Sequence, residues 1–281
     1  MGTAIGPACL RRPILFSQWL PFLMNPHLAR IRIFPVKSLD GHDLSETVVL
    51  ACGGLAHDRQ YCLLDRDDKI LNGKRLGEMI LKIRSDVHLG FGEIRLSDGL
   101  ETATYRVDRD KAKIEAWFSQ RLKQAVHLAE DAVSGFPDDT EAAGPTIIST
   151  ATLRQVGAWF QLDLEETRRR FRANLEIDGV EAFWEDRLYG EAGETVRFHI
   201  GDVEIEGVNP CARCAVPSRD SQTGVILEPG FQKIFADRRR KALPAWASES
   251  RFDHFYRLAV NTRIPASEAG KRLHVMDEVV V

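Results

Sequence analysis

The sequence predicts a mixed, mostly β fold with a few flanking helices. Short runs that alternate apolar and polar residues recur along the 281 residues, as expected for half-buried strands. Turn residues such as Gly53-Gly54 and Asp98-Gly99 separate these runs. Many short strands with regular turns are typical of a barrel or a sandwich. The length allows two domains.

The composition excludes several classes of protein. Hydrophobic residues make up 44% and charged residues 28% of the chain, which are values of globular rather than disordered proteins. Lys and Arg number 38 against 41 Asp and Glu, and the net charge of −3 argues against general nucleic-acid binding. Five cysteines are few and odd in number for a secreted disulfide scaffold, so we expect free thiols in a reducing, cytoplasmic setting.

The N-terminus begins with a segment that we expect to lie outside the fold. Arg11 and Arg12 precede an apolar run, 13–24, which is shorter than the roughly 20 residues needed to cross a bilayer. No cleavage site of a signal peptide follows this run. The sequence therefore predicts that residues 1–23 are a disordered or wrongly assigned leader, that translation starts at Met24, and that the chain has no membrane span.

Residues 24–133 are expected to form a first, strand-rich domain. Strands are predicted over Arg30–Phe34, Gln60–Leu64, Ile94–Leu96 and Ala103–Val107. One helix follows, because apolar side chains fall on one face at helical spacing: Ile114, Trp117, Phe118, Leu122 and Val126. The aromatic residues on that face indicate core packing rather than a cofactor site.

Residues 134–145 are rich in Gly, Pro, Asp and Thr, which predicts an exposed linker to a second domain over 146–281. That domain opens with a helix over Thr150–Phe160 and a second helix capped by Asp163, with Glu166 completing a capping box. Gly201-Asp202 predicts a two-residue hairpin turn between flanking strands. The remaining predicted elements are a helix over Phe231–Leu243 and strands near Phe255–Val260 and Leu273–Val280.

The most informative motif is the Cys-x-x-Cys formed by Cys211 and Cys214 just after the predicted hairpin. A structural zinc site would need two further ligands, and the other cysteines supply no second pair. A thioredoxin-like redox pair should open a helix, which Pro217 disfavours. The third interpretation is a single thiolate ligand to a soft, high-valent metal, with Arg213 favouring the thiolate.

Scattered cations and hydroxyls point to a phosphorylated ligand only when they are taken together. Lys37 and Ser38 follow a predicted strand, and Arg59 and Arg172 each lie in a short polar motif. Arginine recognises phosphate with two hydrogen bonds, and lysine supplies a point charge. These side chains, with hydroxyls at Ser149, Thr150 and Thr152, could surround one phosphorylated cofactor.

The order of the motifs resembles the MOSC superfamily, which is named for the C-terminal domain of molybdenum cofactor sulfurases. The pattern is similar to the mitochondrial amidoxime-reducing component and its bacterial relatives, with an N-terminal β-barrel domain before the MOSC β-barrel domain. Five segments carry the resemblance: FPVKSLDG at 34–41, GLAHDRQY at 54–61, FRANLEIDG at 171–179, IGDVEIEGV at 200–208 and CARCAVPSRDSQTG at 211–224.

The resemblance implies a molybdenum–molybdopterin cofactor between the two domains, with Cys214 as the protein ligand to the metal and the catalytic residue. It aligns Lys37, Ser38, Arg59 and Arg172 with positions that hold the cofactor's phosphate and pterin. It also implies contacts to the cofactor from Ala212 and Arg213 beside the metal, and from Ser149 and Thr152. Cys211 is then expected to be a small, buried residue that supports the loop.

By the same resemblance, we expect a molybdenum-dependent oxidoreductase that reduces N-hydroxylated compounds. Its electrons would come from a separate donor protein, ferredoxin or similar to cytochrome b5. Ala215, Val216 and Pro217 stand where the family often has hydroxyl-rich residues, which bears on the substrate range. One alternative is a carrier of sulfur or of the molybdenum cofactor without small-molecule turnover. Another is a MOSC-fold binding protein without metal.

Overall fold

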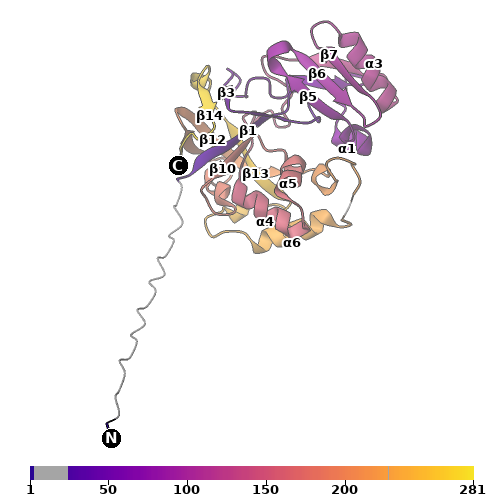
Figure 1. The fold of residues 1–281 in the computed structure, drawn as a ribbon. Coiled ribbons are helices and arrows are strands. Elements are labelled where there is room, and N and C mark those ends of the chain that lie inside the picture. Colours follow the sequence, from indigo (N-terminus) through magenta and orange to yellow (C-terminus); the bar gives the residue numbers. More distant parts are fainter. Residues whose placement is uncertain (3–24, 227) are drawn as a thin grey trace.

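The computed structural model describes residues 1–2, 25–226 and 228–281 (Figure 1). The predicted leader, residues 1–23, lies outside the described residues except for its first two. The described chain is strand-rich with few helices, so the predicted mixed, mostly β fold class is confirmed. Among the described residues, no helix is both long and apolar enough to cross a membrane.

The largest element is a curled, eight-stranded sheet with the strand order β15-β11-β12-β13-β9-β10-β1-β2. Most neighbouring strands run antiparallel, whereas β9 and β10 are parallel. The bounds of its strands are β1 His27–Ile33, β2 His42–Leu44, β9 Ile147–Ser149, β10 Leu175–Asp178, β11 Val196–Ile200, β12 Val203–Ala212, β13 Arg257–Arg263 and β15 Val279–Val280.

Strand β1 belongs to this sheet, although the sequence assigned it to the N-terminal domain. It pairs with β10 on one side, where Ile31 lies opposite Leu175, and with β2 on the other. A register shift between Leu28 and Arg30 places Leu28 and Ile31 in the same hydrophobic core. The first strand of residues 24–133 is therefore built into the sheet of residues 146–281.

A smaller body, distant from α4 and α6 in Figure 1, comes from the first half of the chain. Its strands are β4 Tyr61–Leu64, β5 Arg84–His88, β6 Glu93–Ser97, β7 Thr102–Arg106 and β8 His127–Glu130. Strand β3 Glu46–Val48 pairs with β14 Arg272–His274, and both lie near β1 and β12 in Figure 1, away from this body. Its helices are α1 Gly73–Leu76, α2 Glu78–Leu81 and α3 Lys111–Leu122. Four of the five expected apolar residues lie in α3, whereas Val126 follows the helix and is still buried.

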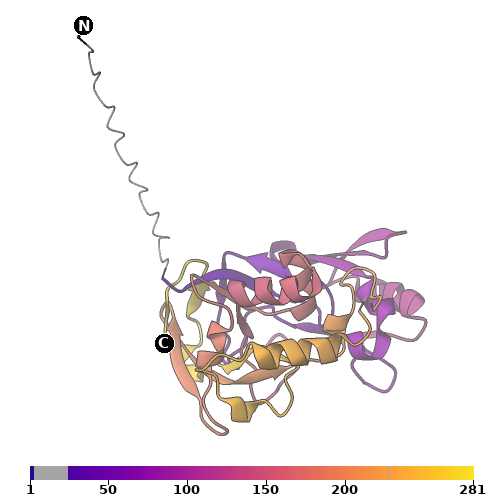
Figure 2. The same cartoon turned by 90° about the horizontal axis from the view of Figure 1, so that it is seen from below.

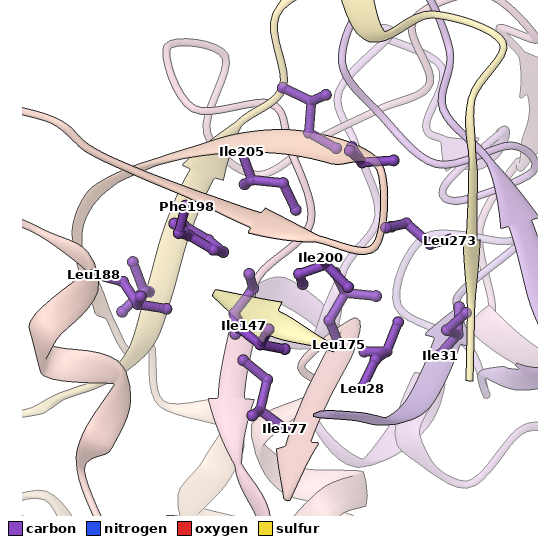
Figure 3. Close-up of a cluster of buried hydrophobic side chains, with 14 of the residues drawn as sticks. Leu28, Ile31, Ile147, Leu175, Ile177, Leu188, Phe198, Ile200, Ile205 and Leu273 are labelled. Atoms are coloured by element: carbon purple, nitrogen blue, oxygen red, sulfur yellow. The ribbon is translucent and has the colours of Figure 1, made fainter. Parts of the chain in front are cut away.

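Both faces of the central sheet are covered by apolar side chains. Figure 3 shows one face, where Ile147, Leu175, Ile177 and Phe198 meet inside the curled sheet. The other face is covered by α4 Thr150–Phe160, α5 Leu164–Phe171 and α6 Phe231–Lys241, and α4 and α6 run alongside one another in Figure 2. Consecutive residues such as Ile147 and Ile148 are consequently buried on opposite faces. Five 3-10 turns complete the fold: η1 Leu89–Phe91, η2 Trp184–Leu188, η3 Val216–Ser218, η4 Glu249–Arg251 and η5 Ala266–Glu268.

Several predicted elements occur at their expected positions. Gly201, at φ 55°, and Asp202 form the turn between β11 and β12, and α4 has the predicted bounds. Asp163 caps α5, since its Oδ1 accepts a hydrogen bond from Glu166 N at 2.7 Å. The capping box is only half formed, because the Glu166 carboxylate binds Arg170 and Ser221 instead.

The segment 134–145 is not the exposed linker that its composition predicts. Gly135, at φ 62°, lies so close to the backbone that a β-carbon would come 2.8 Å from Asp58 O. At the other end, Gly144 N donates to Thr262 O at 2.9 Å, and a β-carbon on Gly144 would come 2.7 Å from that oxygen. Because both ends are docked on the two halves of the protein, we call residues 136–143 the strap.

Candidate functional site

The Cys-x-x-Cys motif lies where β12 ends. Bulges in the pairing with β13 bring Pro210 and Ala212 opposite Val260 and Arg257, and Arg213 N then donates to Tyr256 O at 3.0 Å. Cys211 and Cys214 are half-buried free thiols. The expectation that Cys211 is a buried packing residue is wrong, because both cysteines line the same cavity.

The loop after Cys214 contacts the N-terminal half directly. A β-carbon on Gly73, at the start of α1, would come 2.9 Å from Val216 Cγ2. A β-carbon on Gly224 would come 2.5 Å from Glu78 Cα. The site is thus formed between the two halves, and glycine at these positions permits the close approach.

Two arginines lie over one aromatic ring. The guanidinium carbon of Arg172 lies 4.0 Å from the centroid of the Phe34 ring, and that of Arg59 lies 5.2 Å from it. Both residues have left-handed backbones, with φ 50° for Arg172 at the end of α5 and φ 51° for Arg59 in a turn. Sequence segments more than 100 residues apart are therefore brought together around Phe34.

The two arginines differ in how their charges are balanced. Arg59 forms a salt bridge with Asp58 and donates to Asn174 Oδ1 at 3.3 Å. The Arg172 guanidinium has no carboxylate within salt-bridge distance in the part of the chain that the structure describes. Burial and, second, repulsion from Arg59 lower the pKa of Arg172 to about 10. An anion bound beside Arg172 would relieve this repulsion.

Lys37 is buried, and its ammonium already has partners in the strap. Its Nζ donates to Phe136 O at 2.7 Å and to Pro137 O at 3.0 Å, and it lies 2.8 Å from Asp138 Oδ1. Three acceptors use the three donors of an ammonium group. In this conformation all three donors of Lys37 are therefore used to hold the strap in place.

These cations and both cysteines line one cavity of about 900 Å³. The wall includes Ser38 from the N-terminal half, residues 137–144, and residues 209–214 at the end of β12. Such a volume lies within the usual range for pockets that bind small molecules or cofactors. Of the nine site residues that the sequence predicts, seven line this cavity: Lys37, Ser38, Arg59, Arg172, Ala212, Arg213 and Cys214.

Ser149 and Thr152 are fully buried beneath α4 and do not line the cavity. Ser149 Oγ accepts from Thr152 N at 3.0 Å, so it is the N-cap of the helix. Thr152 Oγ1 donates to Glu185 Oε2 at 3.0 Å. The structure thus corrects the assignment of these two hydroxyls to the cofactor, because both form hydrogen bonds within the fold.

Buried donors without partners provide a test of whether the cavity fits an anionic cofactor. Among the described residues, Arg213 Nε and Nη2 and Arg170 Nη2 are buried and lack a hydrogen-bond acceptor. Both arginines line the cavity. Leaving such charged donors unpaired is costly, and acceptor oxygens of a phosphorylated pterin would satisfy them. With Cys214 as a soft thiolate on the same wall, the residues fit a molybdenum–molybdopterin group.

The other interpretations of the Cys-x-x-Cys motif receive no support from the geometry. Within residues 1–2, 25–226 and 228–281, no three His, Cys, Asp or Glu side chains gather where they could hold a metal ion. Zinc would therefore lack its further protein ligands. Cys214 leads into the 3-10 turn η3 rather than an α-helix, unlike a thioredoxin-type motif.

Sequence reasoning missed three polar residues of the site. Asp138 lies in a segment whose composition signalled only a linker. Asn174 is buried, and its side chain accepts from Arg59 and donates to Arg32 O at 3.0 Å, so it ties α5 to β1. Arg170 has the same sequence signal as its neighbours Arg168 and Arg169, and only the fold shows that it turns inward.

Two family models match the chain in succession. Residues 25–144 match the MOSC N-terminal beta barrel domain, and residues 143–271 match the MOSC domain. The junction between them falls at residues 143–144, where the strap ends and Gly144 is docked.

Curated relatives of known name are distant. Molybdenum cofactor sulfurase 1 of Aedes aegypti is 24% identical over 243 residues, which cover 72% of this chain and 31% of that protein. Molybdenum cofactor sulfurase of Caenorhabditis elegans is 23% identical over 240 residues, which cover 77% of this chain and 32% of that protein. The chain thus spans about a third of the length of these relatives. The two adjoining matches show that the chain belongs to the family of MOSC-domain proteins that carry the N-terminal β-barrel domain.

Proposed function

We propose that the protein binds molybdenum–molybdopterin and acts as an oxidoreductase that reduces N-hydroxylated small molecules. The observation that carries this proposal is the single cavity shared by Cys214, Arg59, Arg172 and Arg213. A soft sulfur ligand and guanidinium groups with unused donors, such as those of Arg172 and Arg213, suit a metal held by a phosphorylated organic cofactor.

The chain's own residues would divide the work of holding the cofactor. Arg59 and Arg172, stacked on Phe34, would bind its phosphate, and the buried donors of Arg213 and Arg170 would bind further oxygens or ring nitrogens. Cys214 would ligate the metal. The bound cofactor supplies two-electron transfer coupled to removal of oxygen from the substrate, and the protein supplies ligation, orientation and access.

The proposal includes a separate electron donor, a ferredoxin or a protein similar to cytochrome b5, and a cytoplasmic location. Support for the donor comes from the described residues, in which only Cys52, Cys62, Cys211 and Cys214 are free thiols. Four-cysteine iron–sulfur clusters need four such ligands together, and these four do not gather. The location rests on the small number of cysteines and the free state of those described.

The experiment that tests this function compares two matched cysteine variants. The full chain is produced in a host that makes the cofactor, and its molybdenum content and its reduction of a model N-hydroxylated amidine by an artificial reductant are measured. We expect Cys214→Ser to lose activity and metal while remaining folded. Cys211→Ser, on the same cavity wall, should keep the larger part of both. Full activity in Cys214→Ser would exclude the molybdenum-enzyme proposal.

A second candidate function is a carrier that delivers or modifies sulfur or the molybdenum cofactor. Two observations favour it: the relatives above are named molybdenum cofactor sulfurases, and two thiols rather than one face the cavity. A carrier would bind one cofactor per chain but would not turn over an N-hydroxylated substrate. A bound cofactor without catalysis under the conditions above would favour this candidate.

A further inference from the structure

The strap places a carboxylate among the cations assigned to the cofactor's phosphate. Asp138 Oδ1 lies 2.8 Å from Lys37 Nζ, and the side chain lines the cavity with Arg59 and Arg172. The Asp138 side chain is 78% exposed. Desolvation by the cavity wall acts to raise its pKa, but the charges of Arg59, Lys37 and Arg172 outweigh this effect and leave the pKa lowered. All three cations therefore act on this one carboxylate.

We propose that Asp138 occupies the phosphate subsite of the empty protein as a built-in counter-ion, which a ligand's phosphate must displace. This inference rests on the proposed cofactor site. In this proposal Asp138 selects ligands by their negative charge, and the strap moves to admit the ligand.

The charges of the site explain why displacement favours a dianion. Asp58 already neutralises Arg59 through their salt bridge. Asp138 is the carboxylate that contacts Lys37, and among the described residues no carboxylate contacts Arg172. If Asp138 is displaced, both cations are therefore left without a carboxylate in direct contact. A phosphate monoester, whose second pKa is about 6, carries nearly two negative charges above neutral pH and compensates both. A monoanion compensates one and has to displace a carboxylate of equal charge.

The strap is built so that its middle can move while its ends stay fixed. Gly135 and Gly144 are docked tightly on backbone at either end. Between them, two contacts hold the strap to the N-terminal half: Lys37 binds Phe136 O, Pro137 O and Asp138, and Phe136 N donates to Arg59 O at 2.9 Å. The link to the C-terminal half is weaker, since Asn261 Nδ2 lies 3.4 Å from Asp139 Oδ2. Displacing Asp138 from the ammonium group thus releases the strap after Pro137, while Phe136 stays bound to Arg59 O.

The test uses the full chain without cofactor and two anions of the same shape. Methyl phosphate is the dianion and methyl sulfate the monoanion, and their binding is measured by calorimetry at pH 8. We expect the unaltered protein to bind methyl phosphate and to give no measurable heat with methyl sulfate. Asp138→Asn should bind methyl phosphate about tenfold more tightly and should now bind methyl sulfate, because a charge-assisted competitor has been removed.

Glu141→Gln is the matched control, because it removes another carboxylate of the strap that lines the same cavity and does not contact Lys37. It should bind both anions as the unaltered protein does. Equal affinities in Asp138→Asn and Glu141→Gln would overturn the proposal, as would methyl sulfate binding to the unaltered protein as tightly as methyl phosphate.

Hydrogen exchange of the unaltered protein gives a second measurement that needs no variant. Methyl phosphate should speed amide exchange over residues 138–139, because displacement releases the strap. Slower exchange there on binding would mean that the strap closes on the anion, and it would refute displacement. Neither measurement needs molybdenum or turnover. Failure of the counter-ion proposal can therefore be told apart from failure of the proposed reductase function.

Discussion

Replacement of Arg172 by methionine should stabilise the empty protein while it removes anion binding. The guanidinium lies half-buried on Phe34 beside a second arginine, and no carboxylate contacts it among the described residues. Methionine keeps a long apolar side chain on the ring but removes the charge. An arginine that stabilised the fold through a salt bridge would give the opposite result.

The magnitude follows from the pKa. A fall from 12.5 to about 10 means that the charged form is disfavoured in the folded state. At about 1.36 kcal/mol per pKa unit, keeping Arg172 charged costs at most about 3 kcal/mol. Because the pKa of a cation is lowered by folding, this cost is fully present below pH 10 and fades above it. Loss of the cation–π contact costs about 1 kcal/mol, so we expect the free energy of unfolding to rise by a net amount of about 1–2 kcal/mol at pH 7.

Urea denaturation of the cofactor-free chain, with and without methyl phosphate, measures both effects. Arg172→Met should unfold at a higher urea concentration than the unaltered protein, and methyl phosphate should no longer stabilise it. Arg168→Met on the same helix is the contrasting control. Arg168 Nε lies 2.7 Å from the buried Glu176, so its loss should destabilise by about 3 kcal/mol or more. The reasoning is refuted if Arg172→Met is less stable than the unaltered chain and is still stabilised by methyl phosphate.

Three further predictions test the surroundings of the site. Ser149→Ala should cost about 1 kcal/mol through loss of the α4 cap and leave molybdenum content unchanged; a drop in metal content would restore Ser149 to the site. Burial and then the Asp186 charge raise the pKa of Glu185 from 4.5 to about 7, so stability should fall as pH rises between these values. Glu185→Gln should remove that fall and gain up to about 3 kcal/mol above pH 7, measured by denaturation across pH. Gly207→Ala should destabilise by more than about 3 kcal/mol in the same assay, since its β-carbon would come 1.6 Å from Leu188 O.

Elements whose signal is local could be predicted from the sequence. The hairpin turn at Gly201-Asp202 and the cap at Asp163 depend on residues within a few positions, and both occur as expected. Strand β9 was missed, because Ile147 and Ile148 are buried on opposite faces and therefore do not alternate with polar residues.

The sequence predicted most of its candidate residues correctly as residues that line one cavity, but it did not predict how their charges are arranged. The motifs identified Arg59, Arg172 and Cys214, which do share a cavity. Ser149 resembled a ligand-binding hydroxyl because a helix N-cap and a phosphate contact use the same residue types. Asp138 could not be recognised, since its role depends on Lys37, about 100 residues away in the chain, and composition alone marked its segment as a linker.

The seating of β1 between β10 and β2 ties the two matched domains together through one sheet, because β1 lies in the first matched region and β10 in the second. Ribosomes add roughly 5–20 residues per second, so β1 waits on the order of ten seconds or more before its partner β10 has been synthesised. During that interval Leu28, Ile31 and Ile33, which are fully buried in the finished sheet, have no core to enter. If the chain were cut between residues 134 and 145, one fragment would contain β10 with an exposed edge. The other fragment would contain these apolar side chains without the core that covers them. Such halves should aggregate when made alone and recover a native fold only when produced together, although the family boundary lies at that point.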